Sequence, residues 1–167
     1  TDEEIGSFDR IYQGVDWGFF PDPFAFIRLH YDRARETIYL LDEMYLQKRS
    51  NDATATMIAE RGYRDAYITC DSAEPKSVAD FRAAGLPAQA AVKGPGSVEY
   101  GMKWLARRKI VIDRRRTPNA YKEFVNYQYS IDKDGNIISG YPDKDNHLID
   151  ATRYALERVY RRYGSKA

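Results

Sequence analysis

A histidine and a carboxylate lie three residues apart near the end of this chain, and together they could bind a metal ion or move protons. They are His147 and Asp150, within the segment 145–156. On a helix, side chains at this spacing leave the same face. The adjoining positions 148, 151, 152, 155, 156 and 159 are Leu, Ala, Thr, Ala, Leu and Val, which a helix would bury. The pair would therefore lie at the margin between core and solvent, where a metal site needs rigid ligands and one open side.

Two further aspartates follow apolar runs earlier in the chain. Asp16 ends the run 11–16 between Gly14 and Gly18, and Asp71 follows the run 66–70. In sheets with parallel strands, ligands gather beyond the carboxyl ends of the strands. Asp71 has a second interpretation as the N-cap of a helix that opens near Pro75, since Asp is a preferred capping residue.

Three carboxylates with one histidine would form a hard ligand set. Such a set favours Mg²⁺ or Mn²⁺ over zinc. It suits phosphoryl transfer through two ions about 3.5–4 Å apart. Crowded acids raise one another's pKa, so the cluster is explained best when cations are bound.

Other motifs are weaker or absent. The segment 93–97, Lys-Gly-Pro-Gly-Ser, could hold a phosphate at a helix N-terminus, or it could be a loop with Ser97 as a cap. The chain contains no G-x-x-x-x-G-K-[ST] and no G-x-S-x-G, which excludes a P-loop ATPase and a serine hydrolase elbow within these residues. We expect His30, in an apolar run far from the acids, to be structural.

Composition limits the class of protein. The 167 residues fit a single domain, 1–167, and are 43% hydrophobic and 31% charged. No segment approaches the ~20 apolar residues of a membrane span, so no membrane partner is expected. The start lacks an apolar signal region and an initiator Met, which suggests a piece of a longer chain. The single cysteine, Cys70, excludes an internal disulfide and suits a reducing compartment.

The charge is nearly balanced. A formal net charge of +1 is not typical of a strong nucleic-acid binder, but basic residues cluster locally. The clusters are 107–109, 114–116 and Arg158 with Arg161 and Arg162. They are either solvated helix ends and loops or contacts for phosphates.

Hydrophobic spacing predicts the elements. Strands are expected at 11–16, 24–31, 37–45, 66–70, 88–92 and 109–112, and helices at 51–61, 75–85, 97–108, 118–127 and 146–162. The turn Asp134-Gly135-Asn136 predicts a β-hairpin over residues 129–140. Three strands with short connections, followed by alternating helix and strand, predict an α/β fold: a mixed sheet that begins with an antiparallel three-strand meander and carries helices on both faces.

Taken together, these segments resemble the nuclease domain of the large terminase subunit of tailed bacteriophages, a DNA-packaging motor protein. The matching stretches are Gly14-Val15-Asp16-Trp17-Gly18 with Asp22-Pro23, the run 69–77, Lys93-Gly94 with Ser97-Val98 and Gly101, then Asn119, Glu123, Tyr127 and Gly135, and finally 145–154. They extend from about Gly14 to Tyr163, and the run 69–77 and the final stretch are specific only in combination.

The resemblance implies a ribonuclease-H-like fold and a metal-dependent endonuclease (a hydrolase) that cuts concatemeric double-stranded viral DNA. It implies that Asp16, Asp71 and Asp150 are catalytic metal ligands, that His147 assists them and that Lys93 is a basic residue near the centre. Asp145 competes with Asp150 for the third position. The expected cofactors are two Mg²⁺ or Mn²⁺ ions, and the hairpin 129–140 would gate DNA entry.

The resemblance also implies partners and a location. An ATPase domain precedes the nuclease in this family and is missing here, consistent with an excised C-terminal domain. The portal protein and the small terminase subunit are the further expected partners, and the host cytoplasm is the expected location. Because the motor could position the substrate, cleavage by the isolated domain stays open.

Three alternatives stay open at the level of sequence. A junction resolvase of the same fold would prefer four-way junctions. A non-catalytic module that docks on DNA or the portal would keep its acids paired with Arg153 or Lys93. An actin-like ATPase would need a second glycine-rich phosphate loop, for which only 93–97 is a candidate.

Overall fold

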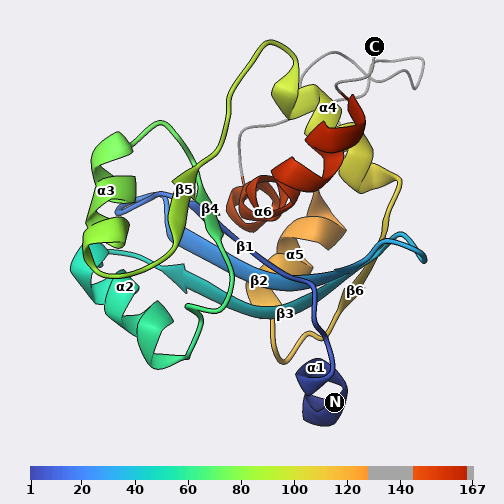
Figure 1. Cartoon of the computed structure of the whole chain (residues 1–167), viewed down its shortest axis with the longest axis horizontal. Coiled ribbons are helices and arrows are strands. Elements are labelled where there is room, and N and C mark those ends of the chain that lie inside the picture. The colour runs from blue at the N-terminus through green and yellow to red at the C-terminus, as the bar shows by residue number, and fades with distance from the viewer. Residues whose placement is uncertain (128–144, 165–167) are drawn as a thin grey trace.

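A mixed β-sheet forms the centre of the molecule (Figure 1). The computed structural model describes residues 1–127 and 145–164, and within them the sheet has six strands in the order β5-β4-β1-β2-β3-β6. The strands are β1 (Ile11–Asp16), β2 (Phe24–Asp32), β3 (Thr37–Leu46), β4 (Ile68–Cys70), β5 (Ala88–Ala90) and β6 (Lys109–Ile112).

The pairing confirms the expected meander. β1, β2 and β3 pair antiparallel in sequence, while β4 lies parallel to β1, β5 parallel to β4, and β6 parallel to β3. The parallel pairs follow helical crossovers, because strands that run in the same direction need a long connection between them. The carboxyl ends of β1 and β4 therefore meet at one edge of the sheet.

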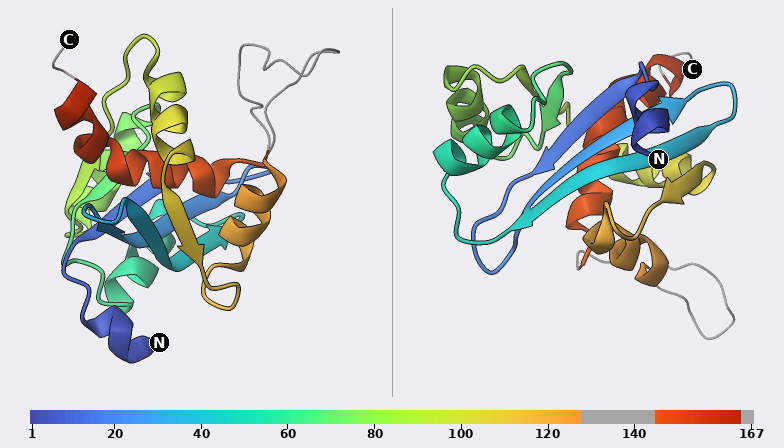
Figure 2. Two further views of the ribbon diagram at one scale, coloured as in Figure 1. Left: turned by 90° about the vertical axis from the view of Figure 1, so that its right-hand side faces the viewer. Right: turned by 90° about the horizontal axis from the view of Figure 1, so that it is seen from below.

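Helices cover both faces of the sheet, as the sequence predicts (Figures 1 and 2). The helices are α1 (Asp2–Gly6), α2 (Asn51–Glu60), α3 (Pro75–Ala83), α4 (Ser97–Ala106), α5 (Pro118–Asn126) and α6 (His147–Gly164). α2 and α3 pack against one face, and α4, α5 and α6 against the other, so that two hydrophobic clusters enclose the sheet.

Strand β2 shows why the sheet has two buried faces. Phe24 and Phe26 belong to the cluster under α2 and α3, whereas Ala25, Ile27 and Leu29 belong to the cluster under α4 to α6. Successive side chains on a strand point to opposite faces, so a continuous apolar run marks a strand that is covered on both sides.

Helix ends follow local signals, with some differences from the expected boundaries. Ser50 is the N-cap of α2, and its side-chain oxygen accepts a bond of 3.1 Å from the amide of Ala53. Gly62, after the same helix, adopts a φ of 82°, which favours glycine. Helix α1 was not predicted, although Thr1 and Glu4 form a capping box there.

Two capping hypotheses were wrong. Glu74, not Asp71, is at the N-cap position of α3, and Gly96, not Ser97, is at that of α4. Pro75 at the first turn of α3 has no amide hydrogen to satisfy, so that end needs less help from a side chain. Asp71 therefore does not cap α3, and its carboxylate is available for other contacts.

Two further expectations concern the hairpin at 129–140 and membrane-spanning helices. The predicted hairpin at 129–140 lies outside the described residues. In residues 1–127 and 145–164, no helix combines the length and the apolar character that spanning a bilayer requires.

Candidate metal centre

Asp16 and Asp71 lie side by side because they end two neighbouring parallel strands. Val15 pairs with Cys70 in the register of β1 and β4, and the amide of Asp71 donates a bond of 2.9 Å to the carbonyl of Val15. Asp16 and Asp71 are the next residues of this ladder. The indole Nε1 of Trp17 also donates to the Asp71 carbonyl at 2.8 Å, which fixes the backbone where the acids emerge.

Helix α6 reaches the same edge because Gly14 lets it approach β1. A Cβ at Gly14 would collide with the carbonyl of Ala151 and would lie 2.8 Å from the nitrogen of Ala155. His147 precedes Ala151 by one turn, about 6 Å along the helix, and Asp16 follows Gly14 by two residues, about 6.6 Å along the strand. The close approach therefore brings His147 to Asp16.

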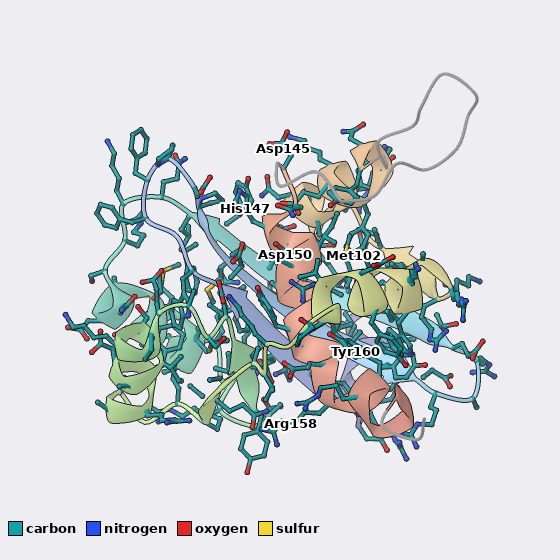
Figure 3. The ribbon with its side chains drawn as sticks, turned by 90° about the horizontal axis from the view of Figure 1, so that it is seen from above. Met102, Asp145, His147, Asp150, Arg158 and Tyr160 are labelled. Atoms are coloured by element: carbon teal, nitrogen blue, oxygen red, sulfur yellow. The ribbon has the colours of Figure 1, made fainter. Side chains whose placement is uncertain are left out.

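The imidazole of His147 pairs with Asp16, as the sequence alone could not show. Its Nδ1 lies 3.1 Å from Oδ2 of Asp16, and its Nε2 lies 3.7 Å from Oδ1 of Asp22. Since an ionised carboxylate only accepts, the Nδ1 of His147 carries the hydrogen in this pair. Figure 3 shows His147 and Asp150 at the same end of α6.

The other two aspartates, Asp71 and Asp150, form ion pairs with basic side chains. Oδ1 of Asp71 lies 2.8 Å from Nζ of Lys93 and accepts a bond of 3.0 Å from the amide of Ala73. Oδ1 of Asp150 lies 3.6 Å from Nη2 of Arg153. Lys93 is thus close to the acids, as the family resemblance implies.

All three carboxylates lie at the margin between core and solvent. Their side chains are 13% exposed for Asp16, 16% for Asp71 and 18% for Asp150. Burial raises the pKa of Tyr154, and the charges of Asp71, Asp150 and Asp16 add to that rise, so all three acids influence this one side chain. Within the part of the chain that the structure describes, however, no three acidic, histidine or cysteine side chains are grouped closely enough to hold one ion.

The electrostatics of Asp16 favour a bound cation. Burial raises the pKa of Asp16, and the charge of Asp71 adds to the rise, although the hydrogen bond from His147 opposes it. The same hydrogen bond raises the pKa of His147 above its ordinary value. A divalent cation would relieve the repulsion between the acids. The oxygen-rich ligand set therefore fits Mg²⁺ or Mn²⁺ chemically.

Two neighbours of the site lie in the stretches that carry the family resemblance, but the sequence assigned them no role. Asp22, from the loop between β1 and β2, is 75% exposed and faces His147. Glu123, on α5, accepts bonds from the amides of Leu148 (2.8 Å) and Ile149 (3.1 Å) at the start of α6. No local pattern connects either residue with His147, because both contacts depend on tertiary packing.

Glu123 is a buried acid that supports the helix bearing His147 and Asp150. Its Oε1 accepts both amide bonds, while its Oε2 has no hydrogen-bond partner among the described residues. Burial raises the pKa of Glu123 to about 7. Its carboxylate satisfies two of the amides that a helix start leaves without partners.

The remaining candidate residues lie elsewhere. His30 stacks on Phe8, with ring centroids 4.2 Å apart, and its Nδ1 lies 3.1 Å from the carbonyl of Arg10, as expected of a structural histidine. Asp145 is exposed and precedes α6 with a φ of 53°.

Comparisons with known proteins show the family of this chain. Residues 16–158 match the family described as the terminase RNAseH-like domain. The chain is 46% identical to the large terminase subunit of Bacillus phage SPP1 over 98% of this chain and 40% of that protein. It is 34% identical to the PBSX phage terminase large subunit of Bacillus subtilis over 86% of this chain and 33% of that protein.

A solved structure gives the same fold. The nuclease domain of the SPP1 large terminase, g2p, determined with bound Mn, superposes with a TM-score of 0.88 at 46% identity, over 95% of this chain and 92% of that one. The chain spans about two-fifths of the length of its SPP1 relative and a third of its PBSX relative. The sequence match and the ribonuclease-H-like sheet agree, and this chain belongs to the terminase RNAseH-like domain family.

Proposed function

We propose that this chain is a metal-dependent endodeoxyribonuclease that cuts double-stranded viral DNA during genome packaging. The observation that carries the proposal is the meeting of Asp16 and Asp71 at the ends of adjacent parallel strands, with His147 and Asp150 beside them on α6. The Mn-bound SPP1 nuclease domain, with which the chain shares 46% of its residues, supports a divalent cation as cofactor.

Asp16, Asp71, Asp150 and His147 would hold Mg²⁺ or Mn²⁺, and we propose two ions. Bound there, the ions would supply an activated water and stabilise the leaving oxygen of a phosphodiester. Asp16 orients His147 through Nδ1 and leaves Nε2, which faces Asp22, either to complete the metal shell or to move a proton. When Asp71 binds the metal ion instead of Lys93, the ammonium group of Lys93 becomes available to a phosphate oxygen.

The substrate and partners are proposed from the family to which this chain belongs. Concatemeric double-stranded DNA is the proposed substrate, cut with little sequence preference. In the whole protein we propose an ATPase domain, the portal protein and the small terminase subunit as partners, and the host cytoplasm as location. These belong to a longer protein than the chain described here.

One observation favours a second candidate, a non-catalytic module that docks on DNA or the portal. Lys93 pairs with Asp71 and Arg153 with Asp150, as expected of acids kept for structure. Metal affinity separates the two candidates, because permanently paired acids would not bind Mn²⁺ at millimolar concentration. A junction resolvase would instead cut four-way junctions in preference to linear duplex.

The test combines metal binding with plasmid cleavage. Titration calorimetry with Mn²⁺ should show binding, and Mn²⁺ should support nicking of supercoiled plasmid. Asp16→Ala and Asp71→Ala should reduce nicking to background. Glu60→Ala, an exposed acid on the opposite face of the sheet, is the matched control and should cut normally. Metal-dependent nicking that survives in both aspartate variants rejects the nuclease assignment.

A further inference from the structure

A cavity of about 660 Å³ opens beside the carboxylates, between the loop before α4 and the second half of α6. Lys93, Arg153 and Tyr154 line it, and the first two of these also form the ion pairs with Asp71 and Asp150. The cavity therefore lies next to the candidate metal centre. Figure 3 shows α6 passing beneath α4, with Tyr160 on the part of α6 away from His147. The volume of the cavity lies within the range of small-molecule sites, about 300–1,000 Å³.

Two side chains that line this cavity each hold a buried polar atom with no hydrogen-bond partner among the described residues. Arg153 is 6% exposed and its Nε has no acceptor among the described residues, while Glu157 is 4% exposed and its Oε2 has no donor there. Buried polar groups are normally paired, so each such atom needs an explanation. One atom is a donor and the other an acceptor. A phosphate would suit only the first, whereas the edge of a nucleobase carries donors and acceptors side by side.

The opening of the cavity offers an aromatic ring and a cation. Tyr100, on α4, is 44% exposed, and its ring centroid lies 5.8 Å from that of Tyr160. Arg161 has a 51% exposed side chain, with Nη1 at 3.2 Å from Oε1 of Glu157. That same oxygen accepts the amide of Val92 at 2.7 Å, so the acid is held in place. Aromatic rings beside a basic groove are the usual platform for single-stranded nucleic acid.

We propose that this cavity binds one unpaired nucleotide of the DNA strand next to the cut, with its base against Tyr100 and its backbone at Arg161. The proposal rests on the nuclease function above, which brings a DNA strand to the carboxylates. A base inside a duplex is stacked and paired and cannot enter without leaving the helix. The cavity therefore favours DNA that is single-stranded or frayed beside the cut over a blunt duplex.

The experiment measures binding without chemistry. A fluorescein-labelled single-stranded octanucleotide and a blunt duplex of the same sequence are titrated with the full chain in EDTA, and fluorescence anisotropy gives each Kd. We expect the single strand to bind more tightly. Tyr100→Ala should weaken its binding about fivefold or more, the lower end for the loss of one base–aromatic stack. Arg161→Gln should weaken it and reduce the salt dependence by about one phosphate contact.

Matched variants separate stacking from other effects. Tyr100→Phe keeps the ring and should bind like the parent chain. Lys103→Ala, on the same helix but paired with Glu99 and absent from the cavity wall, should also bind like the parent. Parental affinity in both Tyr100→Ala and Arg161→Gln overturns the proposal, and so does equal affinity for single strand and blunt duplex. Plasmid nicking with Mn²⁺ is scored separately, so failure of the nuclease proposal is distinguishable from failure of the cavity.

Discussion

Two buried glutamates each hold the start of a helix from outside that helix, and they differ in how completely they are satisfied. Glu43, on β3, uses both oxygens: it accepts from the amides of Asn119 (2.9 Å) and Ala120 (3.1 Å) and from the side chain of Asn119 (2.8 Å) at the start of α5. Glu123, on α5, uses only Oε1 for the amides at the start of α6.

Of these two caps, only that of α6 contains an unsatisfied buried oxygen among the described residues. α5 carries none of the proposed metal ligands, and its cap is complete. α6 carries His147 and Asp150, and its cap is a buried acid whose pKa is raised by burial to about 7. Buried groups with strongly shifted pKa values gather at functional sites. We infer that Glu43 stabilises the fold. Glu123 positions the start of α6, but its buried charge lowers the stability of the folded chain.

The largest expected effect is the loss of the complete cap. Glu43→Ala leaves three donors at the start of α5 without an acceptor and should lower the free energy of unfolding by about 3 kcal/mol. Glu123→Ala frees two amides and removes a costly buried charge, so it should lower that free energy less. Urea denaturation at pH 8 in EDTA measures the free energy of unfolding of both variants. A larger loss for Glu123→Ala than for Glu43→Ala would contradict this order.

Glutamine substitutions should have opposite signs at the two sites. Glu123→Gln keeps the acceptor for Leu148 and Ile149 and removes a charge, so it should raise the free energy of unfolding at pH 8 by about 1–3 kcal/mol. Glu43→Gln places an amide donor near the donating side chain of Asn119 and should lower it by about 1 kcal/mol. The same denaturation series checks both signs. A loss of stability in Glu123→Gln would show that the buried charge of Glu123 does not destabilise the folded chain at pH 8.

The pH dependence should also report Glu123. Its folded pKa of about 7 lies above the ordinary 4.5, so the folded chain binds the extra proton between these values. This contribution to stability is present below pH 4.5 and is lost as the pH rises toward 7. The raised pKa of His147 acts in the same direction above its ordinary 6.5. In Glu123→Gln, the slope of unfolding free energy between pH 5 and 7 should flatten, and an unchanged slope would assign it to other groups.

The smallest expected effect is at an ordinary local cap. Ser50 accepts from Ala53 within its own helix region and is exposed. Ser50→Ala should lower the free energy of unfolding by about 1 kcal/mol, with no change in its pH slope. This value sets the scale against which the two long-range caps are compared. Chemical denaturation at pH 5 and pH 8 should give the same difference from the parent chain.

Local sequence predicted most of the elements and their order. The strands β1 to β3 were expected within one or two residues of their observed bounds, because alternating or continuous apolar runs and short polar turns are local signals. Helix α2, expected at 51–61, spans Asn51–Glu60. The caps of α3 and α4 were assigned wrongly, since a proline or a left-handed glycine replaced the side chain that the pattern suggested.

The site was predicted only in part. Asp16, Asp71, Asp150, His147 and Lys93 were named, and the structure brings them to one edge of the sheet, but their roles stay proposals. The partners that orient them, Glu123 and Asp22, come from segments with no spacing relationship to His147. Such contacts depend on the crossing of α6 over β1 at Gly14, which no periodicity encodes.

By itself, the order of residues determined that this chain builds a meander followed by alternating helices and strands, because hydrophobic period and turn residues act over a few positions. It also determined which side chains could serve as hard ligands. Only the tertiary structure decided that Asp16 pairs with His147, that Lys93 and Arg153 neutralise the other two acids, and that a cavity adjoins them. The physical reason is that charge pairing and burial depend on distances between segments, and the close packing of α6 on β1 sets those distances.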